Sequence, residues 1–90
     1  CVFVPFVRDA QIIGSICPEI IGPVNILAGA STPPINELEK LGVARVSIGG
    51  IMSLAAATAV RLAAEELRDH GTFGFANDLI MHPEMNALLA

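Results

Sequence analysis

The chain has 90 residues, of which 53% are hydrophobic and only 16% are charged, against roughly 45–50% and 25% in an ordinary soluble domain. A chain this short buries a smaller share of its surface than a long one, so on its own it should carry more polar residues. We therefore expect these residues to be part of a larger folded protein. The net charge of -4 and the lack of Tyr and Trp argue against nucleic-acid binding, since they leave neither a basic patch nor a stacking platform.

The cysteines and the lengths of the apolar runs indicate in which cellular compartment the protein is expected. Cys1 and Cys17 fit no metal spacing and are too few for a disulfide framework, so we expect buried free thiols in a reducing, cytoplasmic compartment. No basic region of a signal peptide precedes the first apolar run. The charge-free runs at 20–36 and 46–60 are shorter than the roughly 20 apolar residues of a membrane span. No membrane partner is therefore expected.

The first third of the chain predicts a strand followed by a helix. The run 2–7 is apolar at successive positions, which is typical of a strand covered on both faces. Asp9 is expected to cap a helix, and Pro18 is expected to end it. Between them, apolar residues recur at helical spacing, namely Ile12, Ile13, Ile16 and Cys17.

Two further strand and helix pairs follow. The second strand is expected at 24–28, and a turn-forming run then leads to a helix capped by Ser31 or Thr32 and ended by Gly42. The third strand is expected at 43–48. A long helix from about Ile51 to His70, closed by Gly71, should follow, with a tail and one short helix after it.

Alternating strands and helices predict a parallel sheet. Right-handed crossovers place all the helices on one face of that sheet, yet the apolar run 2–7 puts apolar side chains on both faces. A closed barrel hides the second face as its own interior, whereas a doubly wound sheet would need helices that are missing here. We therefore expect an α/β fold made of the C-terminal three strand–helix units of a (β/α)8 TIM-type barrel, with 1–75 in the barrel and 76–90 as a tail.

The long helix at 51–70 also predicts self-association. Its polar positions form one narrow stripe, and the remainder is apolar and small. This pattern fits packing on the barrel and on another subunit, although an Ala-rich helix packed within one chain would look similar. We expect a homo-oligomer, a dimer or tetramer, through Ile51 to His70 and the tail.

Three runs in the expected order resemble the closing strands of the isocitrate lyase and phosphoenolpyruvate mutase superfamily. They are Val2-Phe3-Val4-Pro5, Gly22-Pro23-Val24-Asn25-Ile26-Leu27-Ala28-Gly29 and Leu41-Gly42-Val43-Ala44-Arg45-Val46-Ser47-Ile48-Gly49-Gly50. The resemblance implies a barrel enzyme in which Mg²⁺ binds a 2-oxo acid or its enolate while a C–C or P–C bond beside it is made or broken. It also implies that the metal ligands and a gating loop lie on earlier strands, outside these residues.

The sequence departs from the lyase members of that superfamily at three positions. Phe6 stands where those members have a Glu, Leu27 where they have a substrate-binding Asn, and Gly29 where they have a Thr. These departures argue against isocitrate or methylisocitrate cleavage and favour a decarboxylase, a phosphonate-type hydrolase or another member. No catalytic residue is assigned within the chain.

Candidate substrate-binding residues lie where the predicted strands end, because barrel active sites lie at the carboxyl ends of the strands. Asn25 is expected one layer inside the mouth, where it either joins neighbouring strands or contacts substrate. Gly49 and Gly50 lead into a helix N-terminus, which suits an anion or simply a tight turn. The full set of candidates is Pro5, Phe6, Asn25, Leu27, Gly29, Ser31, Gly49 and Gly50.

Ser31 and the histidines are expected to have structural roles. Ser31 is more readily a helix cap than a nucleophile, because no His lies near it in sequence to act as a base. His70 complements the dipole of the last helical turn. His82, with Asp78 and Glu84 nearby, matches no metal-ligand spacing, so no metal site is expected in the chain.

Two classes of function remain open from the sequence. The first is an enzyme that acts on a small 2-oxo or 2-hydroxy acid, of which this chain, inactive alone, supplies part of the pocket. The second is a non-catalytic barrel remnant or oligomerisation segment. Another phosphate-binding barrel of aldolase type is a third alternative.

Overall fold

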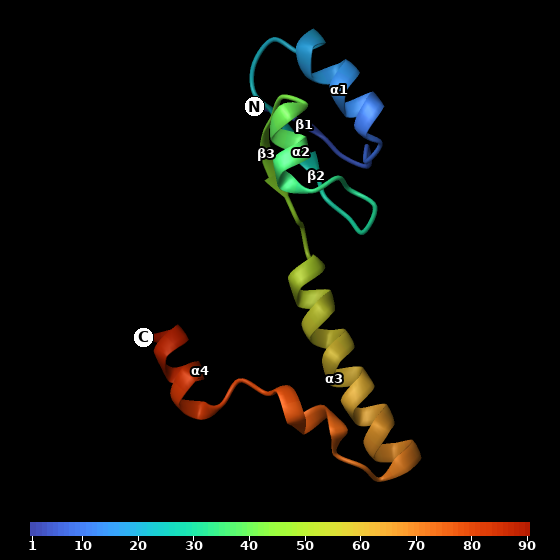
Figure 1. Ribbon diagram of the computed structural model, residues 1–90, viewed down its shortest axis with the longest axis vertical. Coiled ribbons are helices and arrows are strands. Elements are labelled where there is room, and N and C mark those ends of the chain that lie inside the picture. The colour runs from blue at the N-terminus through green and yellow to red at the C-terminus, as the bar shows by residue number, and fades with distance from the viewer. The chain divides into compact units, whose positions relative to one another are not determined.

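A computed structural model describes residues 1–90, which fall into two compact units, Cys1–Ser53 and Leu54–Ala90. Figure 1 shows the elements in chain order. They are β1 (Val2–Val4), α1 (Ala10–Glu19), β2 (Val24–Leu27), α2 (Ile35–Lys40), β3 (Val43–Ser47), α3 (Ile51–His70), the 3₁₀ helix η1 (Gly74–Asp78) and α4 (His82–Leu89).

The first unit contains the predicted parallel sheet. Its strands lie in the order β1-β2-β3, and both neighbouring pairs are parallel. Asn25 in the central strand pairs with Phe3 on one side and Arg45 on the other. Because Val24 pairs with Val43, Ala44 is one extra residue on β3, which makes a bulge there.

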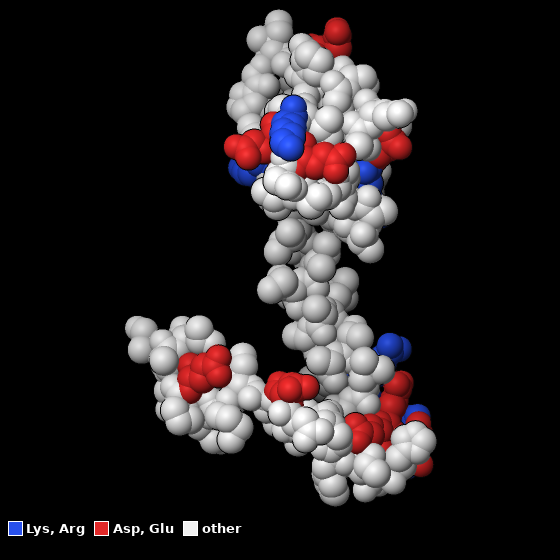
Figure 2. Space-filling view, in the orientation of Figure 1, with Lys and Arg blue, Asp and Glu red and all other residues white.

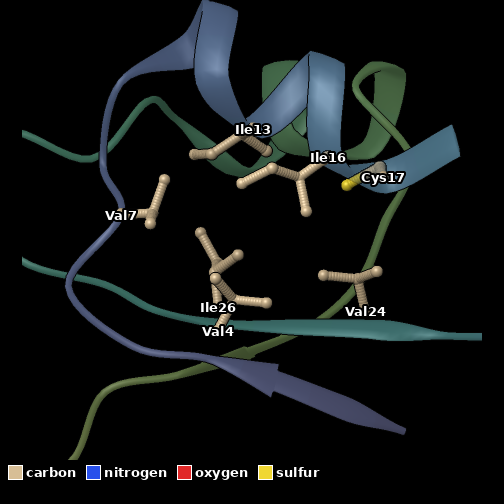
Figure 3. A pocket seen from close by; sticks show the side chains of 7 residues that line it. All are labelled: Val4, Val7, Ile13, Ile16, Cys17, Val24 and Ile26. Carbon is tan, nitrogen blue, oxygen red and sulfur yellow. The ribbon is translucent and has the colours of Figure 1, made fainter. Parts of the chain in front are cut away.

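One face of the sheet carries the core. Ile13 of α1 and Leu38 of α2 pack with Val24 and Ile26 of β2, and each of the four is almost fully buried. Burying a side chain of this size contributes about 1.5–3 kcal/mol. Figure 3 shows α1 lying over this face with Ile13 directed at the strands. The small space that remains between α1 and the sheet has no room for a water molecule, so it is core packing and not a binding site.

The opposite face of the sheet is only partly covered. Phe3 is 49% exposed, and Arg45, its neighbour across Asn25, is also exposed. Both helices of the first unit that pack on the sheet do so through the other face. The uneven cover agrees with the expectation that this face belongs inside a closed barrel.

The helix α1 begins as predicted but continues past its proline. Asp9 Oδ1 accepts hydrogen bonds from the backbone N–H groups of Gln11 at 2.9 Å and Ile12 at 3.0 Å. The prediction that Pro18 ends the helix is wrong by one residue, because α1 runs to Glu19. Near a C-terminus a proline costs only one hydrogen bond, and Ile20 N–H still donates to Ile16 O at 3.2 Å.

The strand β1 is shorter than predicted. It ends at Val4, and Pro5 and Phe6 form a turn instead of continuing to residue 7. Phe6 has φ 65, in the left-handed region that strongly disfavours a bulky residue. An apolar run is consistent with a strand at all six positions, so hydropathy alone did not reveal the turn.

The helix α2 does not have the predicted cap. Its N-cap is Pro34, with no side-chain hydrogen bond, so neither Ser31 nor Thr32 caps it. Thr32 instead holds the preceding turn, since its Oγ1 accepts from Gly29 N–H at 2.8 Å and its own N–H donates to Gly29 O at 3.0 Å. Gly42, with φ 91, follows the helix as predicted.

The helix α3 has the predicted bounds, and the second unit contains most of it. It ends at His70, and the following Gly71, whose φ is 63, is the expected glycine stop. No residue of α3 is buried within the chain, and from Ile51 to Val60 it carries no charged side chain (Figure 2). None of the helices is both long enough and apolar enough to cross a membrane.

The chain reversal after α3 is fixed by one carboxylate. Glu66 Oε1 accepts from the Thr72 hydroxyl and from Gly74 N–H, both at 2.6 Å, and Oε2 accepts from Phe75 N–H at 3.2 Å. The short helices η1 and α4 follow, where the sequence predicted one short helix. The helix η1 spans the expected boundary between 1–75 and 76–90, and α4 lies within the expected tail.

Candidate functional site

The carboxyl ends of the three strands lie at one edge of the sheet, because the strands are parallel. The loops that leave this edge are residues 5–9, 28–34 and 48–50. Active sites of barrel enzymes form at this edge. Apart from the strand residues Asn25 and Leu27, every candidate named from the sequence lies in these loops.

Asn25 is the one buried polar residue of the chain, with 2% of its surface exposed. The Ser47 hydroxyl lies 2.9 Å from Asn25 Nδ2 and 3.1 Å from Asn25 Oδ1. Of the two roles weighed from the sequence, the structure shows the amide joining β2 to β3. The register places Leu27 opposite Ser47, so both lie one step nearer the carboxyl edge than Asn25 does.

Leu27 and Gly49 come together at the edge. A methyl group built on Gly49 would lie 3.5 Å from Leu27 Cδ1, an ordinary contact, while one built on Gly50 would meet nothing. Gly49 has φ 54, so the left-handed backbone conformation, and not a lack of space, favours glycine at this position. Gly50 leads into α3, where Ile51 N–H donates to Ile48 O at 3.2 Å.

Arg8 approaches Gly29, a contact that the sequence analysis missed. A methyl group built on Gly29 would lie 2.6 Å from Arg8 Cζ, 2.7 Å from Nε and 2.8 Å from one terminal nitrogen. The guanidinium therefore lies directly against the Gly29 backbone at the end of β2. The available signal was that Arg8 is the one Lys or Arg in the three loops of this edge.

An open groove of about 420 Å³ lies between the first two loops and the helices that follow them. Its lining is Arg8, Asp9, Ala10, Ser31, Pro33 and Glu37. Ser31 is exposed there and carries no cap interaction. Neither Pro5 nor Phe6 lines the groove; both are exposed in the turn after β1, Phe6 at 80%.

The chain's own residues do not form a metal centre. No group of three or more His, Cys, Asp or Glu side chains is placed to hold an ion, the region of Asp78, His82 and Glu84 included. Both cysteines are free, as expected, but neither is fully buried. Cys1 is exposed because it precedes the first strand, and Cys17 is half-buried.

The arrangement defines a class of protein. Three parallel strands with helices on one face, a second face left for an interior and polar residues at the carboxyl edge are features of part of a TIM-type barrel. The family model of phosphoenolpyruvate phosphomutase matches residues 1–68. The chain belongs to this family, within the superfamily of isocitrate lyase and phosphoenolpyruvate mutase.

One solved structure extends the comparison over nearly the whole chain. A protein from Burkholderia cenocepacia J2315, provisionally assigned as a lyase/mutase, is 34% identical and superposes with a TM-score of 0.86. The match covers 98% of this chain and 32% of that one, so the chain spans about a third of that structure's length. No curated protein is significantly similar in sequence.

Proposed function

We propose that these residues form part of an enzyme that makes or breaks a C–C or P–C bond in a small 2-oxo or 2-hydroxy acid through an enolate intermediate. Family membership over residues 1–68 supports a lyase or mutase type of function. The observation that carries the proposal is the carboxyl edge, where Gly29, Gly49 and Arg8 lie on neighbouring loops of one parallel sheet.

The edge residues have distinct roles in this proposal. Asn25 and Ser47 hold β2 and β3 in register beneath the mouth. Gly49 and Gly50 bring free backbone amides to the N-terminus of α3, where an anionic group is favoured. Pro5, Phe6, Leu27, Gly29 and Ser31 complete the proposed substrate contacts.

Mg²⁺ belongs to the proposal as the group that would stabilise enolate charge. The resemblance to the superfamily implies that its ligands lie on earlier strands, so they are expected outside residues 1–90. The 90 residues alone are accordingly expected to be inactive. A homo-oligomer through Ile51 to His70 and the tail, and a cytoplasmic location, also remain predictions.

Enolate formation can be measured without knowing which bond the enzyme breaks. The intact polypeptide would be incubated with pyruvate and other small 2-oxo acids in D₂O, with Mg²⁺ or with a chelator, and deuterium entry beside the carbonyl followed by NMR. We expect exchange with at least one 2-oxo acid that requires Mg²⁺.

The alternatives give different results in that experiment. A non-catalytic remnant or an oligomerisation segment would exchange no substrate proton above the rate in buffer. An aldolase-type barrel would exchange without Mg²⁺ and would be trapped on the substrate by borohydride reduction of a Schiff base. Either result would contradict the proposal.

A further inference from the structure

The Arg8 guanidinium lies close to Gly29 at the carboxyl edge. The three nearest atoms to a methyl group built on Gly29 all belong to the Arg8 guanidinium, at 2.6–2.8 Å. Distances under 3.0 Å are too short for real contacts, so any side chain at residue 29 would displace the guanidinium. The φ of Gly29 lies outside the left-handed region. The absence of a side chain at Gly29 therefore leaves the space that the Arg8 guanidinium occupies.

The charge of Arg8 has no partner in the chain. The one ion pair within 4.0 Å is Arg68 with Asp69. Asp9, next to Arg8, is engaged in capping α1 through its Oδ1. The guanidinium therefore lies at the mouth with its donors available, and its planar fork suits the two oxygens of a carboxylate.

We propose that Arg8 binds a carboxylate group of the substrate and that Gly29 is a specificity-determining residue because it leaves room for the guanidinium. This inference rests on the proposed function, which supplies a carboxylate in every 2-oxo acid. It adds a recognition residue that lies in the loop between β1 and α1.

Glu37 offers a competing explanation. It lines the same groove as Arg8, so the arginine could serve to neutralise Glu37 and stabilise the two loops. The two explanations predict opposite effects on anion binding when the charge of Glu37 is removed. If Arg8 binds an anion, removing the nearby negative charge of Glu37 should strengthen anion binding. If the two side chains only support each other, removing either should weaken the site.

The experiment uses oxalate, a dicarboxylate shaped like the enolate of pyruvate, as the probe. Its binding to the intact polypeptide in Mg²⁺ buffer would be measured by calorimetry, together with KM and kcat for the 2-oxo acid that exchanges fastest. The variants are Arg8→Gln, Arg8→Lys, Gly29→Ala, the double variant Arg8→Gln with Gly29→Ala, and Glu37→Gln. Lys40→Gln is the matched control, since Lys40 ends α2 at the opposite edge of the sheet.

We expect Arg8→Gln to weaken oxalate binding and raise KM roughly 10- to 100-fold, the range for losing a hydrogen bond to a charged group. Arg8→Lys should lose less, because it keeps the charge without the fork. Gly29→Ala should change KM in the same direction, and the double variant should be no worse than Arg8→Gln alone, because both changes remove one interaction. Lys40→Gln should behave as wild type, and Glu37→Gln should bind oxalate more tightly.

Several results would overturn the inference. They are unchanged oxalate affinity in Arg8→Gln, additive losses in the double variant, or weaker oxalate binding in Glu37→Gln. Turnover that is insensitive to Arg8 would reject this inference while leaving the proposed function standing. Arg8-dependent oxalate binding in a protein that turns over no 2-oxo acid would reject the proposed function alone. Thermal melting of each variant would show that the fold is retained.

Discussion

Ser47 and Asn25 pair across two strands, with the Ser47 hydroxyl 2.9 Å from the Asn25 amide nitrogen and 3.1 Å from its amide oxygen. Asn25 lies in the central strand, where α1 and α2 leave one face of the sheet uncovered. A buried amide on an otherwise apolar strand is tolerated because this hydroxyl satisfies it. The pair also fixes β2 against β3 next to the bulge at Ala44.

Replacing Ser47 by Ala should lower the free energy of unfolding by about 1–3 kcal/mol, because it leaves the buried Asn25 amide without its partner. Urea denaturation of the intact polypeptide would measure the change. Ser15→Ala is the control: Ser15 is exposed in α1, and a surface substitution of this kind changes stability by less than about 0.5 kcal/mol. Equal stability of the two variants would show that the pair contributes nothing.

Replacing Phe6 by Gly should stabilise the protein by roughly 0.5–1 kcal/mol. The left-handed conformation at φ 65 costs a bulky residue about 1–2 kcal/mol, part of which is offset by the greater freedom of glycine in the unfolded chain. Phe6 is 80% exposed, so little packing is lost. The thermal midpoint would be compared with that of Phe73→Gly, an exposed residue whose φ is -127. We expect no gain from that control, and a less stable Phe6→Gly would contradict the strain argument.

The sequence predicted the long elements better than the short ones. The helix α3 was placed to its end residues because glycines precede and follow it, at Gly50 and Gly71. The parallel sheet followed from the alternation of strands and helices, which depends only on local periodicity. The strand β1 was drawn too long because the apolar run continues through Pro5 and Phe6 while the backbone turns.

The candidate site was less predictable, since it depends on contacts between residues far apart in the sequence. The edge itself followed from strand direction, and so did the position of Gly29 at the end of β2. Arg8 was missed because one exposed arginine carries no pattern of its own. Arg8 became a candidate only through its proximity to Gly29 on the next loop, and a contact between two loops cannot be predicted from local sequence patterns. The partnership of Asn25 with Ser47 is equally non-local.

The turn after α3 should loosen at low pH. Hydrogen bonds from the Thr72 hydroxyl and from the backbone N–H groups of Gly74 and Phe75, with a smaller contribution from His70, hold the pKa of Glu66 below its usual 4.5. A carboxyl whose pKa is lowered by folding stabilises the fold fully above its usual pKa. That contribution is lost as the pH falls from about 4.5 through the lowered pKa of Glu66.

Hydrogen exchange at the Gly74 amide would follow this loosening. We expect protection at neutral pH, after correction for the intrinsic exchange rate, and its loss as Glu66 is protonated. Glu66→Gln should lower the protection at neutral pH and remove its dependence on acid. Glu65→Gln is the matched control, because Glu65 takes no part in these hydrogen bonds. If the protection of the Gly74 amide were the same in Glu66→Gln as in the wild type, the Glu66 carboxylate would not be what fixes the turn.

Residues 1–90 expressed alone should aggregate or bind an apolar dye. The core within the chain consists of Ile13, Val24, Ile26 and Leu38, while α3 buries no residue and leaves Met52, Leu54 and Val60 about 70% exposed. Contiguous apolar surface of this kind drives association unless something covers it. Light scattering after gel filtration, together with dye fluorescence, would test the expectation against the intact polypeptide as control. A monomer of these residues that melts cooperatively and binds no dye would mean that the sheet needs no barrel around it.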